Sequence, residues 1–129
     1  MSLRLGLITN DKLKSVYVNT FDRDSMELIF YRLRKYSQQE LSDLLDLGDI
    51  NHLDESVAKT RFYHRDMGEE LELCEPVIED NVTTWEDIDT DRSPVDYYIV
   101  MKDNKLKITE CFGRKWLSLK QWERWRLNK

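Results

Sequence analysis

The chain opens with alternating apolar and polar residues. Residues 3–7 read Leu-Arg-Leu-Gly-Leu, and this alternation predicts a strand because successive strand side chains point to opposite faces. Residues 9–11, Thr-Asn-Asp, have the composition of a turn, and residues 16–18, Val-Tyr-Val, favour a second strand. The pattern therefore predicts that the chain begins with two paired strands.

Two amphipathic helices are predicted next. Residues 24–27, Asp-Ser-Met-Glu, fit a helix start, and apolar residues then recur within 26–33 at the spacing of one helix face. Residues 37–40, Ser-Gln-Gln-Glu, form a capping box, in which the serine and glutamate side chains satisfy amides at the beginning of a helix. The leucines within 41–45 share one face of this second helix, and Gly48 suits its C-terminal cap.

Residues 49–68 give a mixed signal. The segment 53–62 favours a helix, but the alternation of apolar or aromatic and polar residues over 58–64 fits a strand equally well. Periodicity alone does not decide between them, so both alternatives stay open.

An acidic stretch follows. Residues 69–80 alternate leucine and valine with acids, which predicts a strand that Pro76 interrupts and confines to an edge or a bulge. A further short strand is predicted at 81–85, and residues 85–94 read as an acidic loop.

A β-hairpin is predicted after this loop. Two runs rich in β-branched and aromatic residues, 97–102 and 105–112, flank Asp103-Asn104, whose side chains tolerate the left-handed backbone of a two-residue turn. Such a turn gives one apolar face and one basic face, because strand side chains alternate. The expected apolar-face pairs are Met101 with Leu106, Ile99 with Ile108, and Tyr97 with Glu110.

The C-terminal segment predicts a helix from about Leu119 to near the chain end. Ser118 and Gln121 have the spacing of a capping box. Trp122 and Trp125 are three residues apart and therefore share a helix face. Either both indoles pack on the apolar face of the hairpin, or one is exposed as an anchor for a partner or a nucleobase. The elements together predict a single α+β domain over residues 1–129, with a mostly antiparallel sheet, two to three helices packed on one face and a short C-terminal helix.

Charge is distributed unevenly. The 129 residues carry a net charge of −5, and 35% of them are charged. Residues 66–96 hold 12 acidic residues and 1 basic residue, a net charge of −11, whereas residues 97–129 hold 3 acidic and 9 basic residues, a net charge of +6. Runs of opposite sign either form solvated faces or fold back on one another.

No motif of a known chemistry occurs in the sequence. The Asp87-x-Asp89-x-Asp91 spacing matches the start of a calcium loop, but Arg92 and Tyr98 stand where that loop needs glycine and glutamate. The histidines and cysteines lack zinc-binding spacing, and the four glycines form no phosphate loop. We therefore expect no metal and no cofactor; the question of catalysis stays open, with a non-enzymatic role favoured.

Cellular location follows from two weaker signals. Cys74 and Cys111 are too few for a disulfide framework, and no apolar run is long enough for a signal peptide or a membrane span. The sequence therefore favours a cytoplasmic protein with reduced thiols and no membrane association.

Two functions from different classes are compatible with these features. The favoured one is a small acidic interaction protein, such as an inhibitor, an immunity protein or a phage-type antagonist, that binds a basic surface of another protein. Its expected contact residues lie in the acidic segment: Glu69, Glu70, Glu72, Glu79, Asp80, Trp85, Glu86, Asp87, Asp89 and Asp91. The alternative is single-stranded nucleic-acid binding by the basic face of the hairpin. Its expected contact residues are Tyr98, Lys102, Lys105, Lys107, Arg114 and Lys115. The oligomeric state is left open by either hypothesis.

Overall fold

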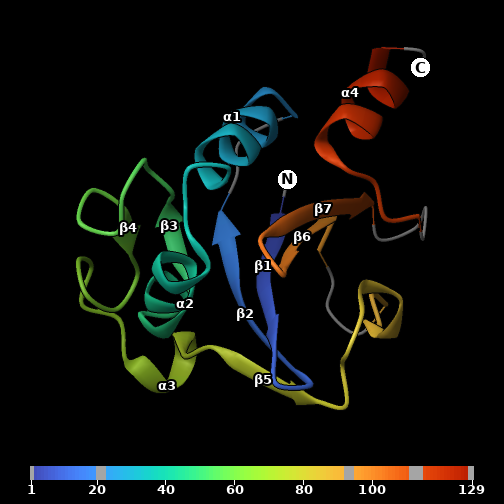
Figure 1. Ribbon diagram of the computed structural model, residues 1–129. Helices are drawn as coiled ribbons and strands as arrows, with labels where there is room; N and C mark the ends of the chain where they lie inside the picture. Colours follow the sequence, from blue (N-terminus) through green and yellow to red (C-terminus); the bar gives the residue numbers. More distant parts are fainter. Residues whose placement is uncertain (1, 20–22, 92–94, 111–114, 128–129) are drawn as a thin grey trace.

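The computed structural model describes residues 2–19, 23–91, 95–110 and 115–127, with the backbone alone for 23–26 and 126–127 (Figure 1). The elements in chain order are β1 (Ser2–Thr9), β2 (Lys12–Asn19), α1 (Arg23–Leu33), α2 (Gln38–Asp46), β3 (Ile50–His52), β4 (Arg61–Phe62), α3 (Leu71–Cys74), β5 (Val77–Asp80), the 3₁₀ helix η1 (Trp85–Asp87), β6 (Tyr97–Lys102), β7 (Lys105–Glu110) and α4 (Leu119–Leu127).

The described strands form one mixed sheet of seven strands. Its order is β4-β3-β2-β1-β6-β7, and β5 pairs with β2. The β1–β2, β2–β5, β3–β4 and β6–β7 pairs are antiparallel, whereas β1–β6 and β2–β3 are parallel. The α+β class is confirmed, but the prediction of a mostly antiparallel sheet is wrong. The two hairpins meet in parallel through β1 and β6, and an alternating pattern carries no information about the direction of a distant neighbour.

Both predicted hairpins are confirmed over the described residues; positions 111–112 of the second predicted hairpin lie outside them. Asn10 and Asp11 in one turn, and Asp103 and Asn104 in the other, all have φ between 50° and 63°. This left-handed geometry at both central residues matches the twist of the flanking strands. The β6–β7 register is also the predicted one: Met101 opposes Leu106, Ile99 opposes Ile108 and Tyr97 opposes Glu110.

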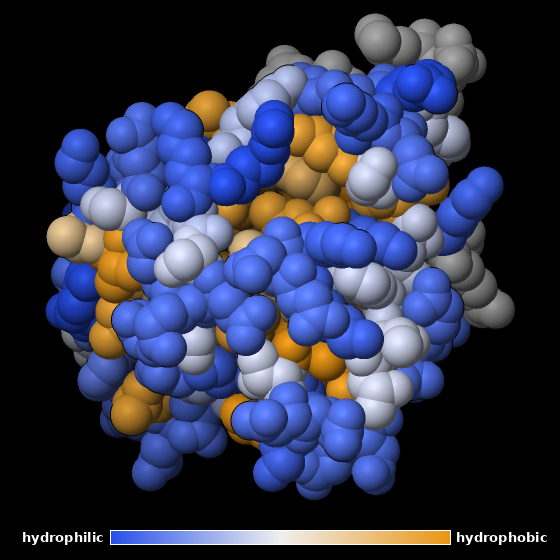
Figure 2. Space-filling model, in the orientation of Figure 1, coloured by the Kyte–Doolittle hydropathy of each residue, from blue (hydrophilic) through white to orange (hydrophobic). Residues whose placement is uncertain are grey.

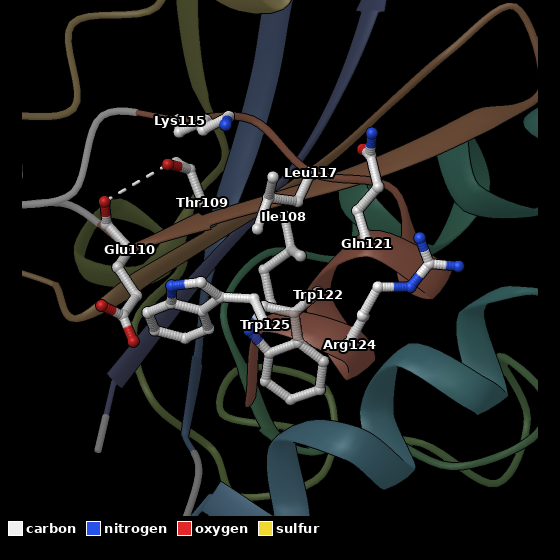
Figure 3. A pocket seen from close by; sticks show the side chains of 9 residues that line it. All are labelled: Ile108, Thr109, Glu110, Lys115, Leu117, Gln121, Trp122, Arg124 and Trp125. Carbon is white, nitrogen blue, oxygen red and sulfur yellow. Dashed lines mark hydrogen bonds between the residues drawn. The ribbon is translucent and has the colours of Figure 1, made fainter. Parts of the chain in front are cut away.

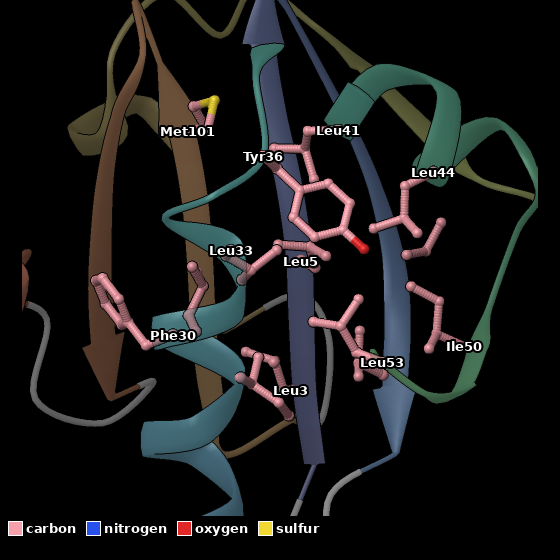
Figure 4. Packing of buried hydrophobic residues seen from close by; sticks show 14 of the residues in the cluster. Leu3, Leu5, Phe30, Leu33, Tyr36, Leu41, Leu44, Ile50, Leu53 and Met101 are labelled. Atoms are coloured by element: carbon pink, nitrogen blue, oxygen red, sulfur yellow. The ribbon is translucent and has the colours of Figure 1, made fainter. Parts of the chain in front are cut away.

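The main core lies on the face of the sheet that carries α1 and α2. Buried side chains of both helices form one cluster with buried leucines of β1 (Figure 4). Figure 4 shows Phe30 and Leu33 of α1 among the same group of side chains as Leu3 and Leu5 of β1. The predicted capping box at the start of α2 is confirmed, since Ser37 and Glu40 exchange both of its hydrogen bonds.

A second core covers the opposite face of the sheet. Val82, Trp85, Ile88 and Val95, all from the acidic segment, are buried there. They pack against side chains of β1, β2 and β6: Ile8, Leu13, Tyr98 and Val100. The sheet is therefore covered on both faces, and five successive residues of β6, 97–101, are buried. A strand buried on both faces needs apolar residues at consecutive positions, which explains the composition of this run.

The helix favoured at 53–62 is absent, and that prediction is wrong. Thr60 Oγ1 accepts a hydrogen bond from the backbone N–H of Asp54 and donates one to the carbonyl of Ser56, at 3.0 and 2.8 Å. Such local bonds from side chain to backbone compete with helix formation. Only Arg61 and Phe62 extend as a strand, so the alternative reading is correct for two residues.

The acidic stretch also departs from its predicted strands. Residues 71–74 form one turn of helix, while the predicted edge strand is confirmed at 77–80, directly after Pro76. The strand predicted at 81–85 is wrong, because Asn81 has a φ of 63° and turns the chain out of the extended conformation. The helix α1 begins at Arg23, and the Asp24 side chain, which was predicted to start this helix, lies outside the described residues.

Candidate functional site

Exposed apolar side chains gather in residues 67–80, which include α3 and β5 and are called the α3–β5 surface below. Figure 2 shows apolar atoms at the surface near the lower left, where Figure 1 places α3. The large apolar side chains and their exposed fractions are Met67 47%, Leu71 44%, Leu73 76%, Val77 46% and Ile78 53%. Single exposed leucines are ordinary, whereas several large apolar side chains exposed in one segment make it a candidate interaction site.

Carboxylates lie in the same segment as these apolar side chains. The same residues 67–80 contain no lysine or arginine. The six acidic residues are Glu69, Glu70, Glu72, Glu75, Glu79 and Asp80, of which Glu79 is half-buried and the others are exposed. Lys12 Nζ lies 3.6 Å from Asp80 Oδ1, with both side chains more than half exposed, and an ion pair of this kind is weak. The α3–β5 surface is therefore apolar and negatively charged.

The end of α2 holds α3 in place. Asp49 donates its backbone N–H to the carbonyl of Cys74 at 2.7 Å. Gly48 has a φ of +86°, and a Cβ at this position would lie 2.3 Å from the Cys74 carbonyl oxygen. The predicted role of Gly48 at the end of α2 is thus supplemented by a close approach between two backbones, which only glycine permits.

The thiol of Cys74 is not suited to nucleophilic chemistry. Its side chain is buried, and Sγ donates a hydrogen bond to the carbonyl of Glu70 at 3.2 Å. Burial raises the pKa of the Cys74 thiol, and the neighbouring carboxylates of Asp49 and Glu69 raise it further. The thiolate, which is the reactive form, is disfavoured here.

The remaining predicted contact residues of the acidic segment, Trp85 among them, lie on η1 and the loop after it. Trp85 is buried with 9% exposure, and its Nε1 donates to the carbonyl of Val100 at 2.9 Å. Asp87 accepts hydrogen bonds from the Thr83 hydroxyl and from the backbone N–H groups of Thr83 and Thr84, and these bonds lower the pKa of Asp87. Glu86, Asp89 and Asp91 are exposed. The predicted contact residues are therefore divided between two places. Those within 69–80 lie toward an edge of the sheet, and those within 85–91 belong to the segment that covers one of its faces.

The predicted nucleic-acid face is partly covered. Tyr98 is 4% exposed and forms a T-shaped ring pair with Trp116, with centroids 6.5 Å apart. Lys107 Nζ lies 4.3 Å from the centre of the Trp85 ring. Lys102 is half-buried and Lys105 is exposed beside the β6–β7 turn, while Arg114 lies outside the described residues. The aromatic ring expected to stack on bases therefore faces the second core.

A pocket of about 430 Å³ lies between β7 and α4 (Figure 3). Trp122 is buried in the main core, whereas Trp125 is 36% exposed at this pocket, so the two indoles have different environments. Lys115 of the predicted nucleic-acid set and Arg124 also line the pocket. Aromatic faces together with cations suit a planar or anionic group.

Residues 115–127 also confirm the predicted start of α4. Ser118 donates its backbone N–H to Gln121 Oε1 at 2.9 Å, and Ser118 Oγ accepts the backbone N–H of Gln121 at 3.3 Å. The sequence prediction overlooked Met67 and Glu75 as members of the α3–β5 surface. A count of every carboxylate would have found Glu75, whereas no sequence signal shows that Met67 is exposed.

Within the described ranges, no three histidine, cysteine, aspartate or glutamate side chains come together as a metal site. None of the helices in these ranges has the length and apolar character needed to cross a membrane. Comparison with protein-family models, curated proteins and solved structures gave no match. The function of this chain is therefore inferred from its own geometry.

Proposed function

We propose that this protein acts by binding another protein that presents a basic surface, and that the α3–β5 surface makes the contact. One observation carries the proposal: five large apolar side chains, 44–76% exposed, lie in a segment that holds six acidic residues and no lysine or arginine and that ends in the edge strand β5. Burial of apolar area supplies affinity, while complementary charge raises the association rate and selects the partner.

The distribution of apolar residues singles out this surface from the rest of the acidic segment. In residues 82–95 the large apolar side chains are buried against the sheet. The carboxylates of that part then form the solvated outer side of a core layer. In residues 67–80 the apolar side chains remain at the surface beside the carboxylates. Only the second arrangement offers a partner both apolar contact and charge.

Charge supports a basic partner over an acidic one. No cation is present among residues 67–80, and the Lys12–Asp80 pair at the end of β5 is mostly exposed. A partner surface rich in lysine or arginine would be attracted over distances of about 10 Å at moderate salt, and an acidic one repelled. The resulting complex is expected to dissociate more readily as the salt concentration rises.

Affinity capture with matched variants tests this proposal. The double variant Leu73→Ser/Ile78→Ser removes two exposed side chains from the α3–β5 surface, and Leu28→Ser removes one of similar exposure, 48%, from α1. We expect the wild type and Leu28→Ser to retain the same basic protein from lysate at low salt and to release it at high salt. The double variant is expected to retain little of it. Equal capture by all three proteins, or capture of none, would refute the proposal.

Single-stranded nucleic-acid binding is the second candidate, and the pocket beside α4 favours it. Trp125 offers an exposed indole for stacking, with Lys115 and Arg124 as phosphate-binding cations. Burial of Tyr98 removes the stacking ring that the hairpin face was expected to provide. The same capture experiment separates the two functions, because nuclease treatment would release material held through nucleic acid and leave a direct protein complex intact.

A further inference from the structure

The outer edge of β5 has no partner strand among the described residues. On its inner side, β5 pairs with β2, with Val77 opposite Ser15 and Glu79 opposite Leu13. The other edges of the sheet are less accessible. On the outer side of β7, Ile108 exchanges two backbone hydrogen bonds of 2.8 Å with Leu117, and β4 is two residues long. The β5 edge is therefore the place where an added strand meets unpaired backbone groups.

The hairpin turn determines which backbone groups of β2 face β5. Asn10 and Asp11 form a two-residue turn, so the flanking residues Thr9 and Lys12 exchange hydrogen bonds. Because the pattern alternates, even-numbered residues of β2 direct their N–H and C=O groups toward β1, and odd-numbered residues direct them away. Tyr17, an odd-numbered residue, follows this alternation, because its backbone N–H points away from β1 and donates to Asp49 Oδ1 at 2.9 Å.

The same alternation assigns the backbone groups of β5. Leu13 and Ser15 are odd-numbered, so they bond with the residues opposite them, Glu79 and Val77. The N–H and C=O groups of Ile78 therefore point away from β2, toward the outer edge, as do those of Asp80. The side chains of Val77 and Ile78 point to opposite faces of the sheet, and they are 46% and 53% exposed. Both side chains that border this edge are therefore partly accessible to a partner.

We infer that the basic partner contributes an extended segment that pairs with the outer edge of β5 as an additional strand. This inference rests on the proposed function and specifies how the α3–β5 surface is used. The outward N–H and C=O groups of Ile78 and Asp80 supply the backbone hydrogen bonds. The apolar side chains of the added strand lie on one face, beside Ile78, and its basic side chains lie on the other face, beside Val77 and Glu79.

Charge decides that the added strand comes from a basic protein and not from a second copy of this chain. Glu75, Glu79 and Asp80 lie at or beside the edge, so two copies of β5 would bring like charges together. Lysine or arginine side chains on the added strand would instead face these carboxylates. The edge thus resists self-association and accepts a strand of opposite charge.

Proline variants of β5 test which of its residues direct their backbone N–H groups toward the outer edge. Proline is tolerated in an edge strand where the N–H faces solvent, and it is not tolerated where the N–H bonds to a neighbour. We expect Ile78→Pro to melt close to the wild-type temperature and Val77→Pro to melt well below it. In the wild type, the amide hydrogen of Ile78 is expected to exchange faster than those of Val77 and Glu79. Loss of folding in Ile78→Pro together with slow exchange at Ile78 would overturn the assignment.

Binding of a defined probe tests strand addition itself. The probe is a fluorescent peptide of alternating lysine and valine, compared with a peptide of alternating glutamate and valine. We expect the lysine peptide to bind the wild type and to protect the Ile78 amide from exchange, whereas the glutamate peptide does not bind. Ile78→Pro should bind the lysine peptide about tenfold more weakly than Ile78→Ala, because only the proline variant lacks the outward N–H.

Two outcomes would count against strand addition. Equal affinity of Ile78→Pro and Ile78→Ala would show that the backbone of the edge is not used, and absence of lysine-peptide binding would remove the mode altogether. Either result leaves the proposed function standing if Leu73→Ser/Ile78→Ser still loses the captured protein. The two proposals therefore fail separately.

Discussion

Replacement of Trp85 measures how firmly the acidic segment is attached to the sheet. The indole is 9% exposed, donates a hydrogen bond of 2.9 Å to the Val100 carbonyl and lies beneath the Lys107 ammonium at 4.3 Å. Trp85→Phe keeps an aromatic ring for Lys107 but removes the hydrogen-bond donor. Trp85→Ala removes the donor, the ring and most of the buried volume.

The expected magnitudes follow from these contacts. Loss of the donor to a buried carbonyl costs about 1–3 kcal/mol, so Trp85→Phe should lower the free energy of unfolding by roughly that amount. Trp85→Ala also loses the cation–π contact, worth about 0.5–1 kcal/mol, and leaves a cavity, for a total of about 3–5 kcal/mol. The alanine variant is also expected to free the loop after η1, which increases amide exchange over residues 82–91.

Urea unfolding followed by far-ultraviolet circular dichroism gives these free energies without relying on tryptophan fluorescence. Trp125→Phe is the matched control, and because Trp125 is 36% exposed its effect should be smaller than that of Trp85→Phe. A Trp85→Phe variant within about 0.5 kcal/mol of the wild type would show that the indole hydrogen bond does not hold this layer in place.

Two further predictions concern backbone conformation and pH. Gly48→Ala should lose about 1–2 kcal/mol of stability for the left-handed backbone and about 1–3 kcal/mol more for displacing the Cys74 carbonyl. Gly68 has a φ of +75°, and a Cβ there would meet nothing within 4 Å, so Gly68→Ala should lose only the backbone contribution. Thermal melts of both variants measure the difference. A similar loss in both variants would contradict the close approach at Gly48. Hydrogen bonding lowers the pKa of Asp87, so its contribution to stability is present above the ordinary value of 3.8 and is lost as pH falls through the lowered pKa. Burial raises the pKa of Asp49, so its contribution is present at low pH and is lost as pH rises through the raised pKa. Urea unfolding at about pH 7 and about pH 3 checks both assignments. At the higher pH, Asp87→Asn should be less stable than the wild type and Asp49→Asn more stable, and both differences should be smaller at the lower pH. Differences in the free energy of unfolding that do not change with pH would refute the assignment.

Much of the local structure could be read from the sequence because its causes are local. The two-residue turns need residues that tolerate positive φ, and Asn10-Asp11 and Asp103-Asn104 supply them. The capping boxes that begin at Ser37 and Ser118 depend on side chains three residues away. The site was predicted in part for the same reason, since the excess of carboxylates in residues 66–96 is a property of composition.

Long-range contacts decided what the sequence left open. The parallel pairing of β1 with β6 joins segments more than 90 residues apart, and neither strand encodes the identity of its neighbour. Leu73 and Trp85 are both large apolar residues in the acidic segment, yet one is 76% exposed and the other is buried. The difference arises because residues 82–95 find a sheet face to cover, whereas α3 and β5 lie at an edge where the sheet ends. Whether an apolar residue among acids serves the core or a partner is therefore determined by what lies opposite it in the folded chain.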